Sequence, residues 1–101
     1  MSKSEAIKIV KKYAKELKKN NFSFSQIFLF GSYAKGSYKK DSDIDVAVVS
    51  DQVKKFNNIF LLRRMRRQID TRIEPHAFTI ADFKNLSDPL VYEIKKTGIK
   101  I

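Results

Sequence analysis

The 101-residue sequence contains no cysteine and no apolar stretch long enough to cross a membrane. The first absence excludes disulfides and thiolate metal sites. The second absence, with no apolar segment behind Met1, leads us to expect neither a signal peptide nor a membrane anchor, and therefore a soluble protein of the cytoplasm. Internal repeats, linkers and low-complexity segments are also lacking, so a single domain over residues 1–101 is expected.

Positive charge is in excess, with 21 Lys and Arg against 11 Asp and Glu and a formal net charge of +10. This balance favours anionic partners such as nucleotides, RNA or an acidic protein surface. Lys-rich helices that only face solvent explain the composition equally well. The charge therefore does not identify the partner by itself.

The hydrophobic pattern predicts three strands and several helices. Apolar runs predict strands over residues 26–30, 44–49 and 72–78. Helical spacing predicts helices over residues 2–20, 54–69 and 89–96, and shorter ones after residue 31 and over 80–85. In the helix over 54–69, the side chains expected to face inward are Phe56, Ile59, Phe60, Leu62, Met65 and Ile69.

Helix caps and a proline refine this prediction. Ser2 and Glu5 have the spacing of a capping box, and Asp88 before Pro89 is typical of a helix start. Pro75 lacks an amide hydrogen, so the third strand is expected at a sheet edge, or bulged or ending there. The predicted fold class is α/β (α+β), with a small mixed three-stranded sheet flanked by helices.

A Gly-Ser pair and two aspartates flank the loop between the first two predicted strands. Gly31 and Ser32 follow the first strand, and after ten intervening residues Asp43 and Asp45 stand at the start of the second. Backbone amides beside a glycine can cradle phosphates. Two aspartates on one side of a strand raise each other's pKa unless a cation lies between them. Alone, Gly31 would be a turn residue and Asp43 a loop residue; together they predict a site for Mg²⁺ and phosphates.

This segment resembles the GSX10DXD signature of the nucleotidyltransferase fold superfamily. More narrowly, it is similar to the minimal nucleotidyltransferases that pair with HEPN-domain toxins as antitoxins. Gly31, Ser32, Asp43 and Asp45 occupy the signature positions, and residues 88–94 are also similar to this subfamily. The resemblance implies a nucleotidyltransferase fold, ATP as substrate and two Mg²⁺ ions held by carboxylates. It further implies a third carboxylate on the next strand, a place that Glu74 fits.

Other residues near these positions allow two interpretations. Glu74 is either a metal ligand or the partner of Arg72 or of an arginine in the preceding helix. His76 fits a structural or hydrogen-bonding role beside the site better than that of a ligand. Basic residues that could contact a triphosphate or a partner, or only face solvent, are Lys35, Lys39, Lys40, Arg63, Arg64, Arg66 and Arg67.

We therefore expect a Mg²⁺-dependent nucleotidyltransferase that transfers AMP from ATP to a protein hydroxyl. Its metal-binding and catalytic residues would be Asp43, Asp45 and Glu74, and its nucleotide-binding residues Gly31 and Ser32. The resemblance implies that the acceptor is a tyrosine of a HEPN ribonuclease toxin, which the modification would silence. Two alternatives remain: a non-catalytic antitoxin of the same fold that acts by complex formation, and an RNA nucleotidyltransferase, for which 101 residues leave no separate RNA-binding domain.

Overall fold

A single mixed sheet organises the chain in the computed structural model, which describes residues 1–101. The strands are β1 (Gln26–Phe30), β2 (Ile44–Val49), β3 (Ile73–Phe78) and β4 (Ile99–Lys100), in the spatial order β3-β2-β1-β4. Strand β2 runs parallel to β3 and antiparallel to β1, and β4 is antiparallel to β1. The predicted fold class is confirmed, but the sheet has four strands and not three.

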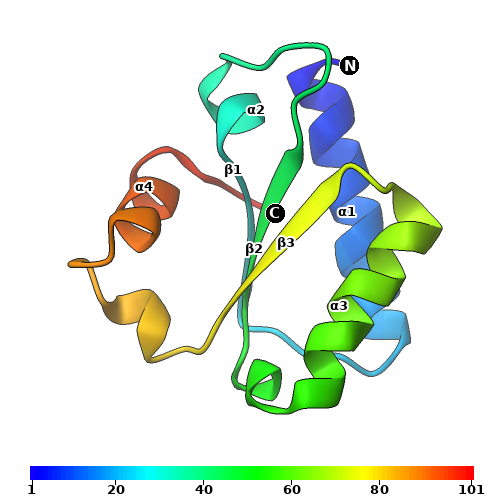
Figure 1. Ribbon diagram of the computed structural model, residues 1–101, viewed down its shortest axis with the longest axis vertical. Helices are drawn as coiled ribbons and strands as arrows, with labels where there is room; N and C mark the ends of the chain where they lie inside the picture. The colour runs from blue at the N-terminus through cyan, green and yellow to red at the C-terminus, as the bar shows by residue number, and fades with distance from the viewer.

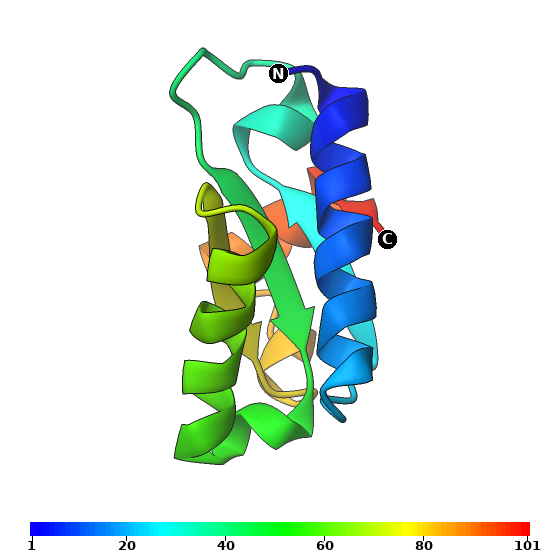
Figure 2. The same ribbon diagram turned by 90° about the vertical axis from the view of Figure 1, so that its right-hand side faces the viewer.

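Helices cover both faces of this sheet (Figures 1 and 2). Helices α1 (Lys3–Lys19) and α3 (Phe56–Ile69) lie side by side on one face, and α4 (Pro89–Thr97) lies on the other. The short α2 (Ser32–Lys35) comes directly after β1. Two single turns of 3-10 helix, Asp51–Lys54 and Asp82–Lys84, connect β2 to α3 and β3 to α4. None of these helices has the length and apolar character needed to cross a bilayer.

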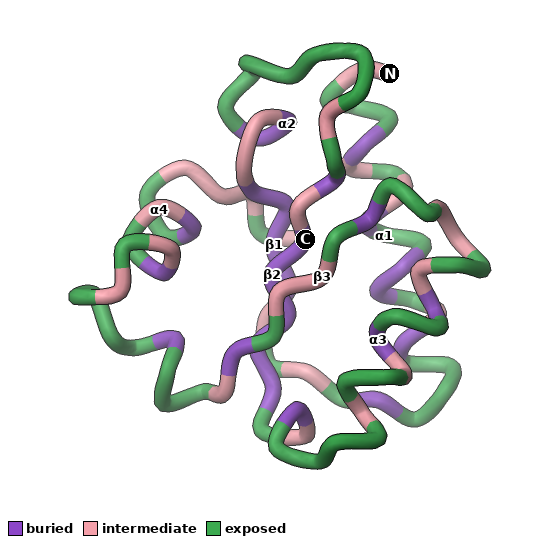
Figure 3. The backbone as a smooth tube through the Cα atoms, viewed as in Figure 1, coloured by how far each residue is buried: buried purple, intermediate pink, exposed green.

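Alternation along β2 divides the core between the two faces. Ile44, Val46 and Val48 pack into the larger cluster with α1 and α3, whereas Ala47 and Val49 pack into the smaller cluster under α4. In Figure 3, residues coloured as buried follow one another along these central strands. Since successive side chains of a strand point to opposite faces, Asp45 belongs to the α4 face.

The predicted N-terminal caps of α1 and α4 are present. The Ser2 side chain accepts a hydrogen bond from the Glu5 amide at the start of α1. The Asp88 side chain accepts one from the Leu90 amide, with Pro89 in the first turn of α4. Both bonds satisfy amides that have no partner within the helix, which explains why the helices begin at these residues.

The edge position expected for the strand that contains Pro75 is also confirmed, because β3 has a neighbour on one side only. The Ile44 amide donates to the carbonyl of Arg72, and the Ser50 amide donates to that of Phe78. In a parallel ladder alternate residues bond to the neighbouring strand, so Pro75 faces the free edge. Its missing amide hydrogen therefore leaves no gap in the ladder.

Three details of the helical prediction are wrong. Helix α3 begins at Phe56, and residues 80–85 form only the single turn Asp82–Lys84. Leu62 and Met65 are buried as expected, but Phe56, Ile59 and Phe60 are exposed. A helix on the surface of a sheet buries one side only. At 3.6 residues per turn, Phe56 and Phe60 lie more than about 100° around the axis from Leu62, whereas Ile59 lies at the border of the buried side.

The fourth strand, β4, was not expected from the sequence. It contains two residues directly after Gly98, which is too short for an alternating pattern to be visible. Its pairing with β1 is extended by a hydrogen bond from the Ile101 amide to the carbonyl of Ile27. This strand closes the sheet on the side opposite to β3.

Candidate active site

The three predicted carboxylates lie near one another where β2 and β3 begin. Asp43 directly precedes β2, and Asp45 is the second residue of that strand. Glu74, on β3, is the register partner of Asp45. Asp43 and Glu74 are exposed, whereas Asp45 is half-buried. The sheet therefore brings together acidic side chains that lie up to 31 residues apart in the chain.

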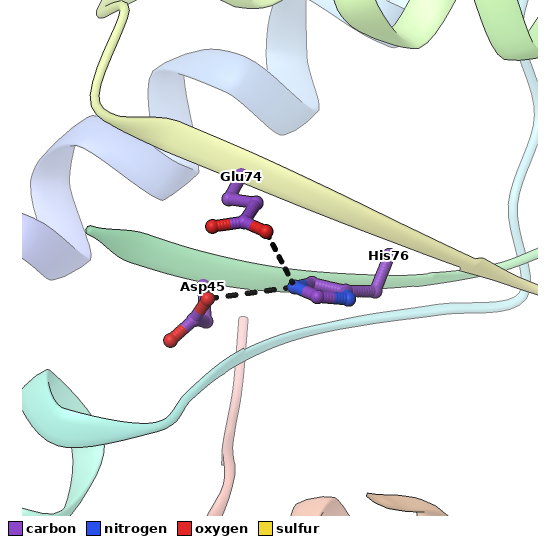
Figure 4. A group of neighbouring side chains, drawn as sticks. All are labelled: Asp45, Glu74 and His76. Carbon is purple, nitrogen blue, oxygen red and sulfur yellow. Dashed lines mark hydrogen bonds and ion pairs between the residues drawn. The ribbon is translucent and has the colours of Figure 1, made fainter.

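His76 completes this cluster, two residues after Glu74 and on the same side of β3 (Figure 4). Its Nε2 atom lies 3.4 Å from Oδ1 of Asp45 and 3.9 Å from Oε1 of Glu74. One ligand atom from each of these three residues lies within 4.8 Å of the other two. The ring also packs edge-on against Phe30, the residue opposite Asp45 on β1, which fixes its orientation.

The electrostatics of the cluster reflect crowding of negative charge. The pKa of Glu74 is raised, chiefly because its carboxyl shares a hydrogen bond with that of Asp43, and further by partial burial. The pKa of His76 is raised above its ordinary range, chiefly by its hydrogen bond to Asp45. The raised pKa values of Glu74 and His76 both indicate that the acidic cluster stabilises added positive charge.

Gly31 brings the backbone against the same carboxylates. It has φ +75° and ψ −150°, a conformation that side chains rarely adopt, and it forms the N-terminal boundary of α2. A β-carbon at this position would overlap Oδ2 of Asp45. The chain thus turns from β1 into Ser32 and α2 directly beside the carboxylate of Asp45.

A cleft of about 420 Å³ opens beside the cluster at the edge of β3. Acidic groups and His76 form one wall, and arginines from α3 and the following loop form the other. The lining residues are Asp43, Arg63, Arg66, Thr71, Arg72, Ile73, Glu74, Pro75 and His76. The sequence alone left the arginines as either solvent-facing or partner-binding; Arg63 and Arg66 recur at a helical interval of three, which was the available signal for a shared face.

The alternative role for Glu74 is not realised. Arg72 pairs with Asp70, with its Nη2 atom 2.7 Å from Oδ2, and this pairing lowers the pKa of Asp70. Arg66 donates instead to the carbonyls of Thr71 and Ile73. Glu74 therefore forms no ion pair with an arginine and faces Asp43, Asp45 and His76.

The lysines near the Gly-Ser turn differ from one another. Lys35, at the end of α2, forms an ion pair with Glu93 of α4 at 2.9 Å. Lys39 and Lys40 are exposed in the loop before β2. The Lys35 pair ties α2 to α4 across the end of the sheet, whereas the other two lysines are open to solvent.

The donor chemistry of the cluster suits a divalent cation. Carboxylate oxygens are the ligands that Mg²⁺ prefers, and it usually keeps several waters beside one or two carboxylates. Asp43, Asp45 and Glu74 supply such oxygens, and the raised pKa of Glu74 indicates that their charge is not balanced within the chain. His76 offers a nitrogen that this ion does not require.

Comparisons with known proteins identify the family of this chain. The family model described as "Polymerase beta, Nucleotidyltransferase" matches residues 11–101. "Putative protein adenylyltransferase MJ1215" of Methanocaldococcus jannaschii is 49% identical over 45 residues, which are 45% of this chain and only about half (51%) of that relative. "Putative protein adenylyltransferase MJ0141" of the same organism is 26% identical over 102 residues, or 96% of this chain and 99% of the relative.

Solved structures share the fold. A toxin-antitoxin crystal structure with AMP-PNP matches with a TM-score of 0.62 and 22% identity, and a mutant of the toxin-antitoxin MntA-HpeT matches with a TM-score of 0.61 and 20% identity. Each match covers 99% of this chain and 72% of the other. The family model spans most of the sequence, including every residue of the acidic cluster, and the chain therefore belongs to the polymerase beta nucleotidyltransferase family.

Proposed function

We propose that this protein is a Mg²⁺-dependent nucleotidyltransferase that transfers AMP from ATP to a hydroxyl group of another protein. The observation that carries the proposal is the convergence of Asp43, Asp45 and Glu74 on one side of the sheet, against the turn at Gly31. In a chain of this family, that arrangement has the parts needed to hold a metal-bound triphosphate beside an acceptor.

The reaction joins the acceptor oxygen to the α-phosphorus of ATP and breaks the bond between that phosphorus and the oxygen bridging to the β-phosphate. Pyrophosphate leaves, and the hydroxyl proton passes to a base. Bound Mg²⁺ would neutralise phosphate charge and lower the pKa of the hydroxyl. Asp43, Asp45 and Glu74 would hold the metal, and Gly31 and Ser32 would cradle the phosphates through their amides.

Glu74 is the best-placed group to receive the proton. It lies on the edge strand, is exposed and lines the cleft, whereas Asp45 is half-buried and does not line it. His76 would orient Asp45 through the contact at 3.4 Å.

The nature of the acceptor rests on the relatives. Two of them carry the name of protein adenylyltransferases, and the fold recurs in toxin-antitoxin complexes, one of them with AMP-PNP. We propose by analogy that the acceptor is a HEPN-domain toxin, that a tyrosine of it is modified, and that the transfer neutralises it in the cytoplasm. Two bound Mg²⁺ ions are part of this proposal.

The test is transfer of label from α-labelled ATP to a HEPN-type protein encoded beside this chain, with and without Mg²⁺. Asp43→Asn and Asp45→Asn should each reduce transfer at least about 100-fold, because each removes a carboxylate that would hold the metal against the phosphates. Asp41→Asn, in the exposed loop, is the matched control and should transfer normally. Undiminished transfer by Asp43→Asn/Asp45→Asn would disprove the proposed site.

A further inference from the structure

The outer side of α3 carries an aromatic and basic surface that the core does not use. Phe56 and Phe60 are 71% and 56% exposed, and Ile59 is 39% exposed. Arg63, Arg64 and Arg67 continue the surface along the helix. We call these six residues the α3 surface. In Figure 3, exposed backbone marks the outer side of this helix.

The six side chains of the α3 surface lie on one side of the helix and form a stripe along it. At 3.6 residues per turn, Phe56, Phe60 and Arg67 fall within about 40° of one another around the helix axis. The rings of Phe56 and Phe60 pack edge to face with centroids 4.8 Å apart. A second hollow, of about 330 Å³, is formed by Phe60 with the three arginines. The stripe spans roughly 17 Å of helix, about the length of three turns of a partner helix.

The arginines of the α3 surface have no acidic partner within the chain. Helix α3 contains no Asp or Glu, and none of its three outer arginines forms an ion pair. A partner that brings carboxylates and apolar side chains together would complement both the three unpaired guanidinium groups and the exposed rings. Charge complementarity therefore indicates an acidic, partly apolar occupant.

The surface is continuous with the candidate active site. Arg63 lines both the hollow beside Phe60 and the cleft that contains Asp43 and Glu74. A partner seated on α3 would therefore have part of its chain at the edge of β3. Glu74 lines that same cleft together with Arg63.

We propose that the α3 surface docks the acceptor protein through a helix that carries acidic and apolar side chains, and so presents the acceptor hydroxyl to Glu74. The choice of a protein acceptor rests on the proposed function. The surface itself favours protein over RNA. The rings of Phe56 and Phe60 meet edge to face and so do not form a parallel platform for stacked bases, and Ile59 adds an aliphatic contact that no base requires.

Binding to the HEPN-type protein, measured by calorimetry without ATP, tests the docking separately from the chemistry. Phe56→Ser/Phe60→Ser and Arg64→Glu/Arg67→Glu should each weaken binding at least about tenfold. Leu86→Ser/Tyr92→Ser and Lys8→Glu/Lys12→Glu alter exposed residues elsewhere by the same chemistry and should change binding less than about twofold. All substituted side chains are exposed, and thermal unfolding verifies that each variant is folded.

Each outcome has a defined meaning. Wild-type affinity in both α3 variants, or no binding by the wild-type protein, would overturn the docking proposal. So would loss of affinity for a ~20-nucleotide single-stranded RNA in Arg64→Glu/Arg67→Glu while protein binding is unchanged, because the surface would then serve RNA. If the wild-type protein binds through α3 but never transfers AMP, the proposed function fails and the docking surface stands. Asp43→Asn/Asp45→Asn should bind normally.

Discussion

The carboxylate of Asp45 occupies the space that a side chain at position 31 would fill. Gly31 and Asp45 lie at the ends of different strands, 14 residues apart in sequence, and the turn at Gly31 exists in its present form only because no β-carbon is there. This contact links the Gly-Ser half of the site to its acidic half. It makes Gly31 a residue of the site and not only a turn.

Gly31→Ala should therefore damage both stability and activity. The substitution forces a side chain into a positive-φ conformation and against Asp45, at a combined cost of at least about 2 kcal/mol in the free energy of unfolding. Gly36→Ala is the matched control, with φ +79° and nothing within 4 Å of the added carbon. The Gly36→Ala variant should lose about 1–2 kcal/mol in the free energy of unfolding and keep its AMP transfer activity. Urea unfolding and transfer assays measure the two effects; equal activity in both variants would contradict the role of Gly31.

Magnesium should stabilise the folded protein if the acidic cluster binds it. A ligand that binds only the native state at 100 times its Kd adds about 2.7 kcal/mol to the free energy of unfolding. Millimolar Mg²⁺ should thus raise the Tm of the wild-type protein, with a larger rise when ATP is present. The shift should largely disappear in Asp45→Asn and persist in Asp82→Asn, whose carboxylate is remote from the cluster. An unchanged shift in Asp45→Asn would exclude that carboxylate as a ligand.

We expect the protein to lose stability at alkaline pH because the hydroxyl of Tyr13 is buried. This hydroxyl donates to the carbonyl of Leu62 at 2.8 Å, joining α1 to α3. Burial raises the pKa of Tyr13 far above its ordinary value, although the charge of Arg66 opposes this. The folded state thus favours the neutral phenol, so its contribution is complete below pH ~10 and is lost as the pH rises above that value.

Tyr13→Phe should cost about 1 kcal/mol at neutral pH, because the hydrogen bond to Leu62 is lost. It should also reduce the decline in stability above pH ~10, since the hydroxyl of Tyr13 is then no longer present to ionise. Tyr92→Phe, at an exposed position, is the control and should change neither quantity. Chemical unfolding at about pH 7 and about pH 11, on either side of the ordinary tyrosine pKa, provides the measurement. Parallel stability curves for Tyr13→Phe and the wild-type protein would contradict this prediction.

Arg66 is expected to be a structural residue of the cleft. Its Nη1 atom donates to the carbonyls of Thr71 and Ile73, each at 3.1 Å, and so fixes the loop that leads into β3. Arg66→Met keeps most of the apolar stem but removes both charge-assisted bonds, which should cost about 1–3 kcal/mol. Arg67→Met, one residue further and exposed, should cost less than about 0.5 kcal/mol. Equal stability of the two variants in urea would show that the bonds contribute nothing.

Sequence patterns predicted the parts of the fold that local rules control. The apolar runs of β1 and β2, the cap at Ser2 and the edge position of Pro75 all follow from side chains acting on nearby backbone. The exposure of Phe56 and Phe60 did not follow, because apolar residues surround much of α3 and only the tertiary contact decides which side is buried. The two-residue strand β4 depends entirely on its pairing with β1.

The candidate site was predictable to a similar degree. Asp43 and Asp45 were identifiable as candidates because two acids at the start of an apolar strand have few structural explanations. The position of Glu74 in register with Asp45 required the sheet, and the contact between His76 and Asp45 required the parallel pairing of β2 with β3. No sequence pattern shows that Arg63 borders two hollows at once.

The edges of the sheet have a consequence for how this protein meets other chains. At one edge, Pro75 offers no donor and Arg66 already occupies the carbonyl of Ile73. At the other edge, β4 is only two residues long. A foreign strand therefore finds no continuous row of backbone groups to extend. The protein should resist cross-β self-assembly even when concentrated, and selectivity among partners must come from side-chain chemistry and not from strand addition.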